Sequence, residues 1–141
     1  MNPLQKVFIA AHTFVVHASG GKFGSSIGGQ KLLLLTTTGN KSGKPRTVPV
    51  MRFEDGGRQV VVASAAGSPT HPAWFKNLER DANVKIEVDG RRFSARAEVV
   101  TGEERARIWK EVVRAQPRFD EYAKNAKGRE IPVVVLKEAA S

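Results

Sequence analysis

The sequence predicts a mainly β, α+β protein, a small barrel of about six mostly antiparallel strands with helices packed outside it. Three observations indicate this fold class. Six apolar or alternating segments have the length of strands, short turns containing Gly and Asp join most of them as hairpins, and most helical patterns come late in the chain. This order does not fit a doubly wound parallel sheet. The length of 141 residues favours a single domain over residues 1–141.

The amino-terminal segment, residues 1–28, is expected to hold a helix and a glycine-rich loop. Apolar residues recur at helical spacing from Pro3 to Ala18, and five glycines follow in "SGGKFGSSIGGQ". This helix could pack on its own domain, form a lid over a ligand pocket, or lie on a membrane surface. The apolar run Val7–Val16 is interrupted and too short for a bilayer span, and it is a poor secretion signal. We therefore expect a cytoplasmic location, with membrane contact through residues 3–18 as the alternative.

Residues 31–65 are expected to form three strands. Four consecutive leucines in Lys31–Thr38 suggest a strand that is buried on both faces. The turn "GNKSGKP" leads into a second strand at 46–54, where Pro49 indicates a sheet edge or a bulge. A tight hairpin at "DGG" then leads into the third strand at 58–65.

A short helix is expected over residues 72–81, after the loop "AGSPTHP". Pro72 would lie in its first turn, where the missing N–H costs no hydrogen bond. An alternating strand at 83–88 and a longer strand at 91–100 follow, and the dipeptide "DG" joins them as a hairpin.

The last part of the chain combines two helices with a final strand. Thr101 and Glu104 have the spacing of a capping box, which predicts the start of a helix. A short helix or turn is expected at 118–126. The apolar run at 131–138 then predicts a buried strand.

Charge is distributed unevenly along the chain. Residues 1–53 contain seven basic residues and no Asp or Glu, whereas 16 basic and 14 acidic residues are interleaved from residue 54 onward. A region of one sign attracts anions, whether nucleic acid, anionic lipid or a small polyanionic ligand. The absence of cysteine excludes disulfides and thiolate metal sites, and the histidines lack metal-ligand spacing, so we expect no metal.

Two stretches carry the candidate chemistry. Ser25, Ser42 and Ser64 do not lie in a G-x-S-x-G turn, and no histidine is in triad order with a carboxylate, so a reaction would need a bound cofactor. The turn "GNKSGKPR", residues 39–46, offers glycines, a hydroxyl and three cations to a phosphate monoester, although a solvated hairpin tip explains it too. In residues 63–78, small side chains would let a flat ring approach the backbone, although a strand end followed by a core helix also fits.

Together the two stretches resemble the deazaflavin (F420)-dependent nitroreductase family, flavin/deazaflavin oxidoreductases of split β-barrel fold. The pattern T-T-x-G-x-K-S-G-x-x-R-x-x-P is followed by A-S-x-x-G-x-x-x-x-P-x-W-x-x-N-L, and the resemblance covers about residues 29–136. The family binds reduced coenzyme F420, an 8-hydroxy-5-deazaflavin with a phosphate and an oligoglutamate tail. The resemblance implies an F420H2-dependent oxidoreductase that transfers a hydride to a small electron-poor acceptor: a quinone, an enone or unsaturated lactone, or a nitroaromatic.

The resemblance also implies which residues bind the coenzyme. The turn at 40–46 matches the positions that hold its phosphate, and residues 63–65 would bring backbone N–H groups and the Ser64 hydroxyl to the polar edge of the ring. Tyr122 and Ser64 are the catalytic candidates, and Phe119, Tyr122 and Trp74 would contact the substrate. The implied coenzyme-binding residues are Asn40, Lys41, Ser42, Arg46, Thr47, Val48, Pro49, Val50, Met51, Ala63, Ser64, Ala65, Ala73, Trp74, Phe75, Lys76 and Asn77.

Four positions depart from the family pattern, and two of them, Gln116 and Phe119, stand at positions that resemble family tyrosines near the substrate, where only Tyr122 is kept. Asn40 stands where arginine is frequent, and Ala65 stands where some members carry lysine. We expect Lys44 and Lys76 to share the binding of the anion instead. The acid-free first 53 residues would attract the carboxylates of the tail.

Two other functions are alternatives. The same fold could hold FMN, or another phosphate-bearing cofactor, as a carrier or sensor without turnover. A basic nucleic-acid-binding module would need exposed aromatic residues for base stacking, and with ten aromatic residues, several at expected core positions, we expect no nucleic acid partner. No motif selects one acceptor or sets the oligomeric state.

Overall fold

The computed structural model describes residues 26–27 and 30–139. The predicted amino-terminal helix, its lid or membrane role, and most of the glycine-rich loop lie outside these residues. The described elements are β1 (Ser26–Ile27), β2 (Gln30–Thr38), β3 (Pro45–Met51), β4 (Phe53–Asp55), β5 (Arg58–Val62), η1 (Ala65–Gly67), α2 (Ala73–Arg80), β6 (Asn83–Val88), β7 (Arg91–Val99), α3 (Gly102–Ala115), α4 (Arg118–Asn125) and β8 (Val133–Glu138).

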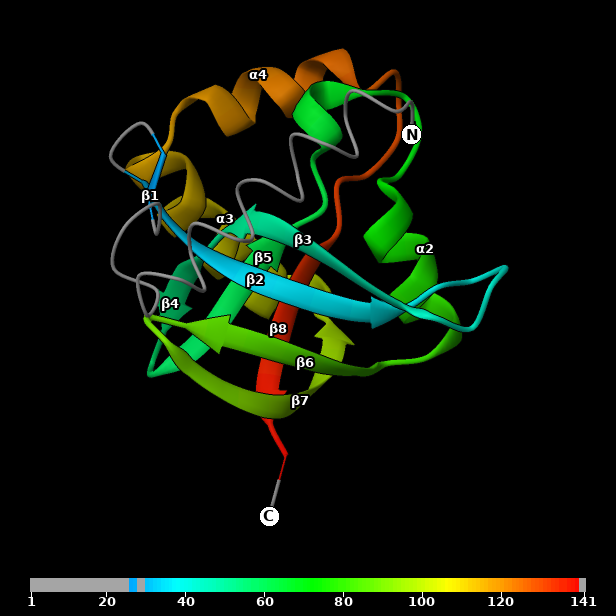
Figure 1. The fold of residues 1–141 in the computed structure, drawn as a ribbon. Coiled ribbons are helices and arrows are strands. Elements are labelled where there is room, and N and C mark those ends of the chain that lie inside the picture. The colour runs from blue at the N-terminus through cyan, green and yellow to red at the C-terminus, as the bar shows by residue number, and fades with distance from the viewer. Residues whose placement is uncertain (1–25, 28–29, 140–141) are drawn as a thin grey trace.

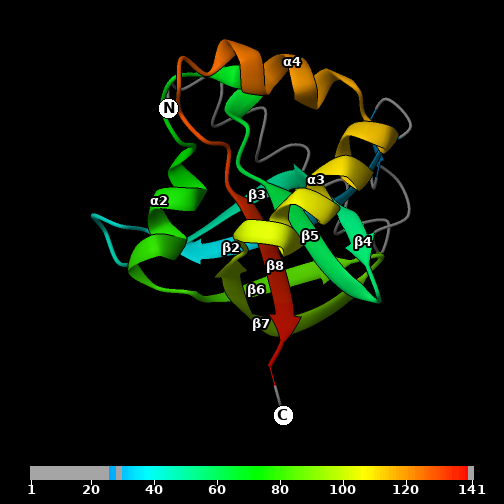
Figure 2. The same cartoon turned by 180° about the vertical axis from the view of Figure 1, so that it is seen from behind.

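The strands form one curled antiparallel sheet with the helices outside it, which confirms the predicted fold class (Figure 1). The strand order is β1-β2-β6-β7-β8-β5-β4, and β3 pairs with β2. Since β3 and β4 are consecutive segments of the chain, the two ends of the sheet are linked through residue 52, and the sheet curls into a barrel. In Figure 2, α3 lies across β5 on the side opposite to β6.

The number of strands differs from the prediction of six, because the described residues form eight strand segments. The predicted strand at 46–54 is divided at Arg52 into β3 and β4, and Ser26–Ile27 adds a short strand where a loop was expected. Pro49 does lie on a strand with a single partner, as predicted for a sheet edge.

Arg52 lies at the division between β3 and β4. Its side chain is buried, and its backbone N–H donates to the carbonyl of Lys31 at 2.9 Å. Its guanidinium donates to the backbone carbonyl of Leu32 at 3.2 Å. It also donates to the carboxylate of Glu54 at 2.8 Å and to that of Asp89 at 3.1 Å. A buried cation is tolerated when its donors are satisfied in this way. The chain therefore turns at Arg52 from pairing with β2 to pairing with β5.

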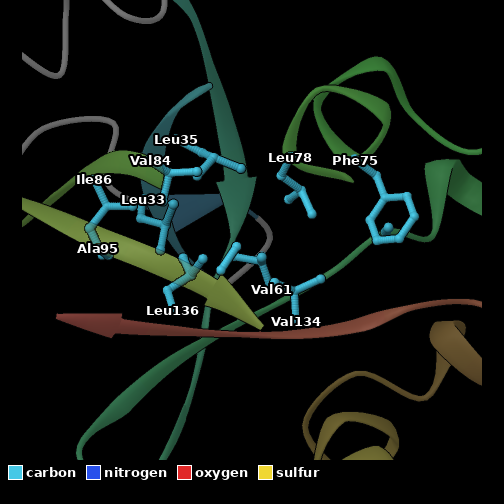
Figure 3. Close-up of a cluster of buried hydrophobic side chains, with 12 residues drawn as sticks. Leu33, Leu35, Val61, Phe75, Leu78, Val84, Ile86, Ala95, Val134 and Leu136 are labelled. Carbon is cyan, nitrogen blue, oxygen red and sulfur yellow. The ribbon is translucent and has the colours of Figure 1, made fainter. Parts of the chain in front are cut away.

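Two apolar clusters hold the barrel together. Leu33 and Leu35 point into the barrel with residues of β5, β6, β7 and β8, and all four leucines of β2 are buried, as predicted. Figure 3 shows Phe75 and Leu78 reaching from α2 toward Val61 and Val134. The second cluster lies between the sheet and the helices α3 and α4.

The predicted hairpin turns are confirmed, but the capping box is not. Gly56 and Gly57 both have positive φ angles, 57° and 84°, as a tight two-residue hairpin requires. Thr101 occupies the N-cap position of α3 but makes no side-chain capping bond. The carboxylate of Glu104 instead lies 3.5 Å from Arg58 of β5. In the described part of the chain, no helix is long and apolar enough to cross a membrane.

The β4–β5 hairpin is tied to α3 through Asp55. Its carboxylate accepts hydrogen bonds from Arg107 of α3 at 2.6 Å and from Arg58 of β5 at 2.5 Å. These bonds, that from Arg107 first, hold the pKa of Asp55 well below its usual range. Because the pKa is lower in the folded chain, this stabilisation is complete above the unfolded carboxyl value of about 3.9 and is lost as the pH falls below it.

We expect the free energy of unfolding to decrease as the pH is lowered from about 5 to about 2, with Asp55 contributing to the loss. Asp55→Asn should lower stability at pH 7 and flatten the pH dependence, as urea denaturation at a series of pH values would measure. Glu79→Gln, at an exposed position of α2 with no salt bridge to a described residue, is the matched control and should change neither. An unaltered pH dependence in the Asp55 variant would contradict this assignment.

Candidate active site

The site begins where β3 separates from β5. β4 pairs with β5 only over residues 53–55 and 58–60, and beyond Val60 the strand β5 pairs with β8 along its other edge. β3 pairs with β2 and, in the described part of the chain, with no second strand. Unpaired strand edges present backbone N–H and C=O groups. A planar ligand with donors and acceptors on its rim could therefore bind between the two strands.

The basic turn between β2 and β3 is held against α2. Asn77 is buried, and its side-chain oxygen accepts from the Asn40 backbone N–H at 2.9 Å, while its amide nitrogen donates to the Thr37 hydroxyl at 3.0 Å. Arg80 donates to the Asn40 carbonyl at 2.9 Å. Figure 1 shows the turn beside α2. Asn77 therefore fixes the turn, because both ends of its amide are used inside the protein.

Gly39 is required at the start of this turn. Its N–H donates to the carbonyl of Lys44 at 2.7 Å, which closes the turn. A Cβ atom at this position would lie 2.6 Å from the Ser42 hydroxyl oxygen and 3.1 Å from the Lys44 carbonyl. Any larger residue would thus displace the groups that form the turn.

The turn and α2 together present cations without carboxylate partners. Ser42 accepts from the Lys44 backbone N–H at 3.2 Å and from the Arg46 guanidinium at 3.3 Å, which draws Arg46 toward the turn. Elsewhere many arginines pair with carboxylates, as Arg58 and Arg107 do. Exposed cations whose charge is not neutralised attract an anion. Within the described residues, the cations of this group with no salt bridge are Lys41, Lys44, Arg46, Lys76 and Arg80.

The loop after β5 forms a concave set of N–H donors. Ser64 is right-handed, with φ −74° and ψ −34°, and Ala65 and Ala66 follow with φ 46° and 54°. A right-handed residue followed by a left-handed one turns successive N–H groups toward one point, a nest that binds anions. No backbone acceptor among the described residues takes the N–H groups of residues 64–66. Left-handed alanines cost about 1 kcal/mol or more each, and such strain is typical of functional sites.

Arg129 holds this loop in place. It lies between α4 and β8 and donates to three backbone carbonyls: Ala63 at 3.0 Å, Ser64 at 2.8 Å and Ser68 at 3.0 Å. A fourth contact, 2.8 Å long, joins it to Nδ1 of His71. Burial lowers the pKa of Arg129, but a guanidinium stays charged at any physiological pH.

Sequence reasoning missed Arg129, and no local signal could have found it. Its partners lie 58 to 66 positions earlier in the chain, and "KGREIP" contains no motif.

Helix α4 packs against the same loop. A Cβ atom on Gly67 would lie 3.1 Å from the Cα and carbonyl oxygen of Tyr122, so only glycine fits there. Tyr122 is half-buried, and its ring lies 5.3 Å from that of Phe119. Phe119 is only 3 % exposed and packs on Phe53. Tyr122 is thus beside the loop, whereas the ring of Phe119 belongs to the core and does not present a surface to a substrate.

Not all of the predicted coenzyme-binding side chains are accessible to one ligand. The run 47–51 follows a strand, so its side chains alternate between the two faces and cannot all contact one flat ligand. Phe75 and Ala63 are buried in the core, which leaves only their backbone for a ligand. Trp74 is half-buried at the edge of that core. Hydrogen bonds join the turn at 40–46 to α2, and contacts of Arg129 with His71, whose ring lies beside that of Phe75, link α2 to the loop at 63–65.

Two hollows lined by described residues lie away from this arrangement. One, of about 260 Å³, lies between β4 and α3 and includes Arg52 and Ile108 in its lining. The other, of about 510 Å³, lies over β2, β6 and β7, and only Thr47 belongs to the predicted site. Neither contains the nest or the cationic turn, so the candidate site remains the separated strand edges.

Comparison with known proteins identifies relatives over nearly the whole chain. The family model for F420H2-dependent quinone reductases matches residues 9–138. An F420H2-dependent quinone reductase of Mycobacterium tuberculosis is 36% identical over 129 residues, covering 89% of this chain and 86% of the relative.

Solved structures agree. An F420-H2 dependent reductase, FDR-A, is 39% identical with a TM-score of 0.68, covering 75% of this chain and 93% of that chain. A domain-swapped dimer is 34% identical with a TM-score of 0.72, covering 96% of this chain and all of that chain. The heme storage protein HutZ of Vibrio cholerae, 15% identical, shares the fold alone with a TM-score of 0.59, covering 80% of this chain and 84% of that chain.

Asn77 generates a prediction about stability. Asn77→Ala should lower the free energy of unfolding by about 1–3 kcal/mol, because the Asn40 N–H and the Thr37 hydroxyl lose their partner. Asn77→Asp keeps an acceptor for both groups and should lose less. Asn83→Ala, at an exposed position, is the control. Urea denaturation compares the three variants, and equal losses for the alanine and aspartate variants would show that the bridge does not matter.

Proposed function

Because the chain belongs to the F420H2-dependent quinone reductase family, we propose that it takes a hydride from reduced coenzyme F420 and delivers it to a quinone-type acceptor. The observation that carries this proposal is the placement of a cationic turn and an N–H nest at the separated edges of β3 and β5. This donor set fits a phosphate-bearing planar coenzyme, because the turn offers neutralising charge and the loop offers backbone donors.

The chain's own residues would hold the coenzyme from two sides. Arg46 can grip a phosphate through two parallel hydrogen bonds, and Lys41 adds a point charge. The Ser42 hydroxyl, which already joins Arg46 to the turn, would add a further donor. The nest at residues 64–66 would take the polar edge of the ring. Lys76, exposed on α2, would extend the cationic surface toward a carboxylate tail.

The bound coenzyme would supply the hydride, since a deazaflavin has carbon where a flavin has its central nitrogen and so favours hydride over single-electron transfer. The protein would hold the acceptor close to the ring and exclude water. The backbone of Tyr122 lies against Gly67, in the loop that would receive the ring, and its hydroxyl is the proposed proton donor to the reduced acceptor. The Ser64 hydroxyl is the second candidate, beside the nest. A quinone is favoured over a nitroaromatic or an enone because the named relatives are quinone reductases.

Replacing the cations of the turn tests the site. Lys41→Ala and Arg46→Ala should each weaken F420 affinity by more than about tenfold, or about 1.4 kcal/mol. Thermal stability should change little, because both side chains are exposed and neither forms a salt bridge with a described carboxylate. Isothermal titration measures the affinity, with Lys110→Ala on α3 as the control. Wild-type affinity in both variants would refute this phosphate site.

Steady-state assays test the activity. With F420H2 as donor, we expect a water-soluble quinone to be reduced faster than a nitroaromatic or an enone. Tyr122→Phe should lower kcat by at least about tenfold while leaving coenzyme affinity unchanged, since a general acid acts on the rate. An absorbance titration with F420 and FMN completes the test. Binding of FMN alone would contradict the proposal, and an unaltered kcat would remove Tyr122 as the donor.

A further inference from the structure

Arg129 contacts the carbonyl ends of two peptide units that form the nest. The Ala63 carbonyl and the Ser64 N–H are the two ends of one peptide unit, and the Ser64 carbonyl and the Ala65 N–H are the ends of the next. The guanidinium donates to both carbonyl oxygens, at 3.0 and 2.8 Å. The N–H ends of the same units are the donors of the nest. A cation therefore stands directly behind two of its three N–H groups.

This arrangement changes what the nest can bind. A hydrogen bond to a carbonyl oxygen polarises the amide and strengthens the donor at its other end, and the effect is larger where water is excluded. Arg129 is half-buried, and no carboxylate among the described residues forms a salt bridge with it. Its positive charge is therefore not neutralised locally. This charge acts on the nest through the Ala63–Ser64 and Ser64–Ala65 peptide dipoles, because both carbonyl ends accept hydrogen bonds from the guanidinium.

His71 completes the surroundings of the guanidinium. A guanidinium can only donate, so Nδ1 of His71 accepts and the neutral imidazole carries its proton on Nε2. The centroid of the His71 ring lies 4.8 Å from that of the buried Phe75, with the two rings tilted by 53°, and this contact helps to fix its position. His71 and Arg129 are the titratable side chains whose contacts with this region are seen among the described residues, and from α4 the backbone of Tyr122 lies against Gly67. Arg129 supplies the permanent positive charge beside the loop.

We propose that Arg129 is a positioning residue that holds the strained nest in shape and, through the Ala63 and Ser64 peptide units, stabilises negative charge on the coenzyme ring bound there. The inference rests on the proposed function, since it assigns the nest to the ring of F420. Ionisation of the 8-hydroxyl spreads negative charge across the conjugated ring to its polar edge. Arg129 should therefore favour the ionised form of the bound coenzyme.

The test compares Arg129→Gln and Arg129→Lys with the wild-type protein. The pH dependence of the visible absorbance of bound, oxidised F420 gives the apparent pKa of its 8-hydroxyl, and titration gives its affinity. Arg129→Gln should raise this pKa by about one unit, a tenfold change, and weaken binding about tenfold. Arg129→Lys keeps a charge but cannot grip both carbonyls, so intermediate values are expected.

Arg105→Gln is the matched control, because Arg105 also donates to a backbone carbonyl, that of Ile131 at 2.7 Å, and pairs with Glu130 next to Arg129, but forms no described hydrogen bond to the carbonyls of residues 63–68. It should lower thermal stability without moving the coenzyme pKa. A folded Arg129→Gln variant with the wild-type pKa and affinity overturns the inference, as does an equal shift in Arg105→Gln. If Arg129→Gln does not fold, wild-type values in Arg129→Lys overturn it. A wild-type protein that binds no F420 refutes the proposed function itself, which separates the two failures.

Discussion

The structure depends on the separation of β3 from β5 at Arg52. A fully closed barrel has no unpaired strand edge. This sheet instead closes through two consecutive strands, β3 before Arg52, which pairs with β2, and β4 after it, which pairs with β5. The buried guanidinium makes that change of partner stable by bonding to Leu32, Glu54 and Asp89. Because the chain changes partner there, one edge of β3 and the end of β5 beyond Val60 face each other without pairing as strands. The candidate site is placed at these two edges.

Buried polar contacts between segments far apart in sequence shape the site. Asn77 joins α2 to the basic turn 37 positions earlier, and Arg129 joins the end of α4 to the loop after β5. Neither residue needs to touch a ligand to matter. The exposed cations, by contrast, have few bonds to the fold, so their charge is available for an anion. Asn77 and Arg129 therefore stabilise the fold around the site, whereas the exposed cations are available to bind a ligand.

The sequence predicted the barrel because its strands carry local signals: the leucines of β2, and the Gly56–Gly57 turn of the β4–β5 hairpin. The two stretches proposed for the site also came from the sequence, since their spacing is local, and the family resemblance implied backbone N–H donors at residues 63–65. The division at Arg52, the left-handed angles of Ala65 and Ala66, and the part played by Arg129 were not predicted, because they depend on tertiary contacts and on backbone angles that alanine rarely adopts. Phe119 was expected to contact the substrate, but its ring packs on Phe53 in the core. This too is a tertiary contact that no local pattern in the sequence shows.

The central claim is that the turn at residues 40–46 binds the phosphate of the coenzyme. Its most direct test is the affinity of the protein for intact F420 compared with that for the phosphate-free 8-hydroxy-5-deazaflavin ribityl compound. Wild-type protein should bind intact F420 at least about tenfold more tightly, and a Lys41→Ala, Arg46→Ala double variant should lose most of that preference. Equal affinities in the wild-type protein, or an unchanged preference in the double variant, would contradict the account.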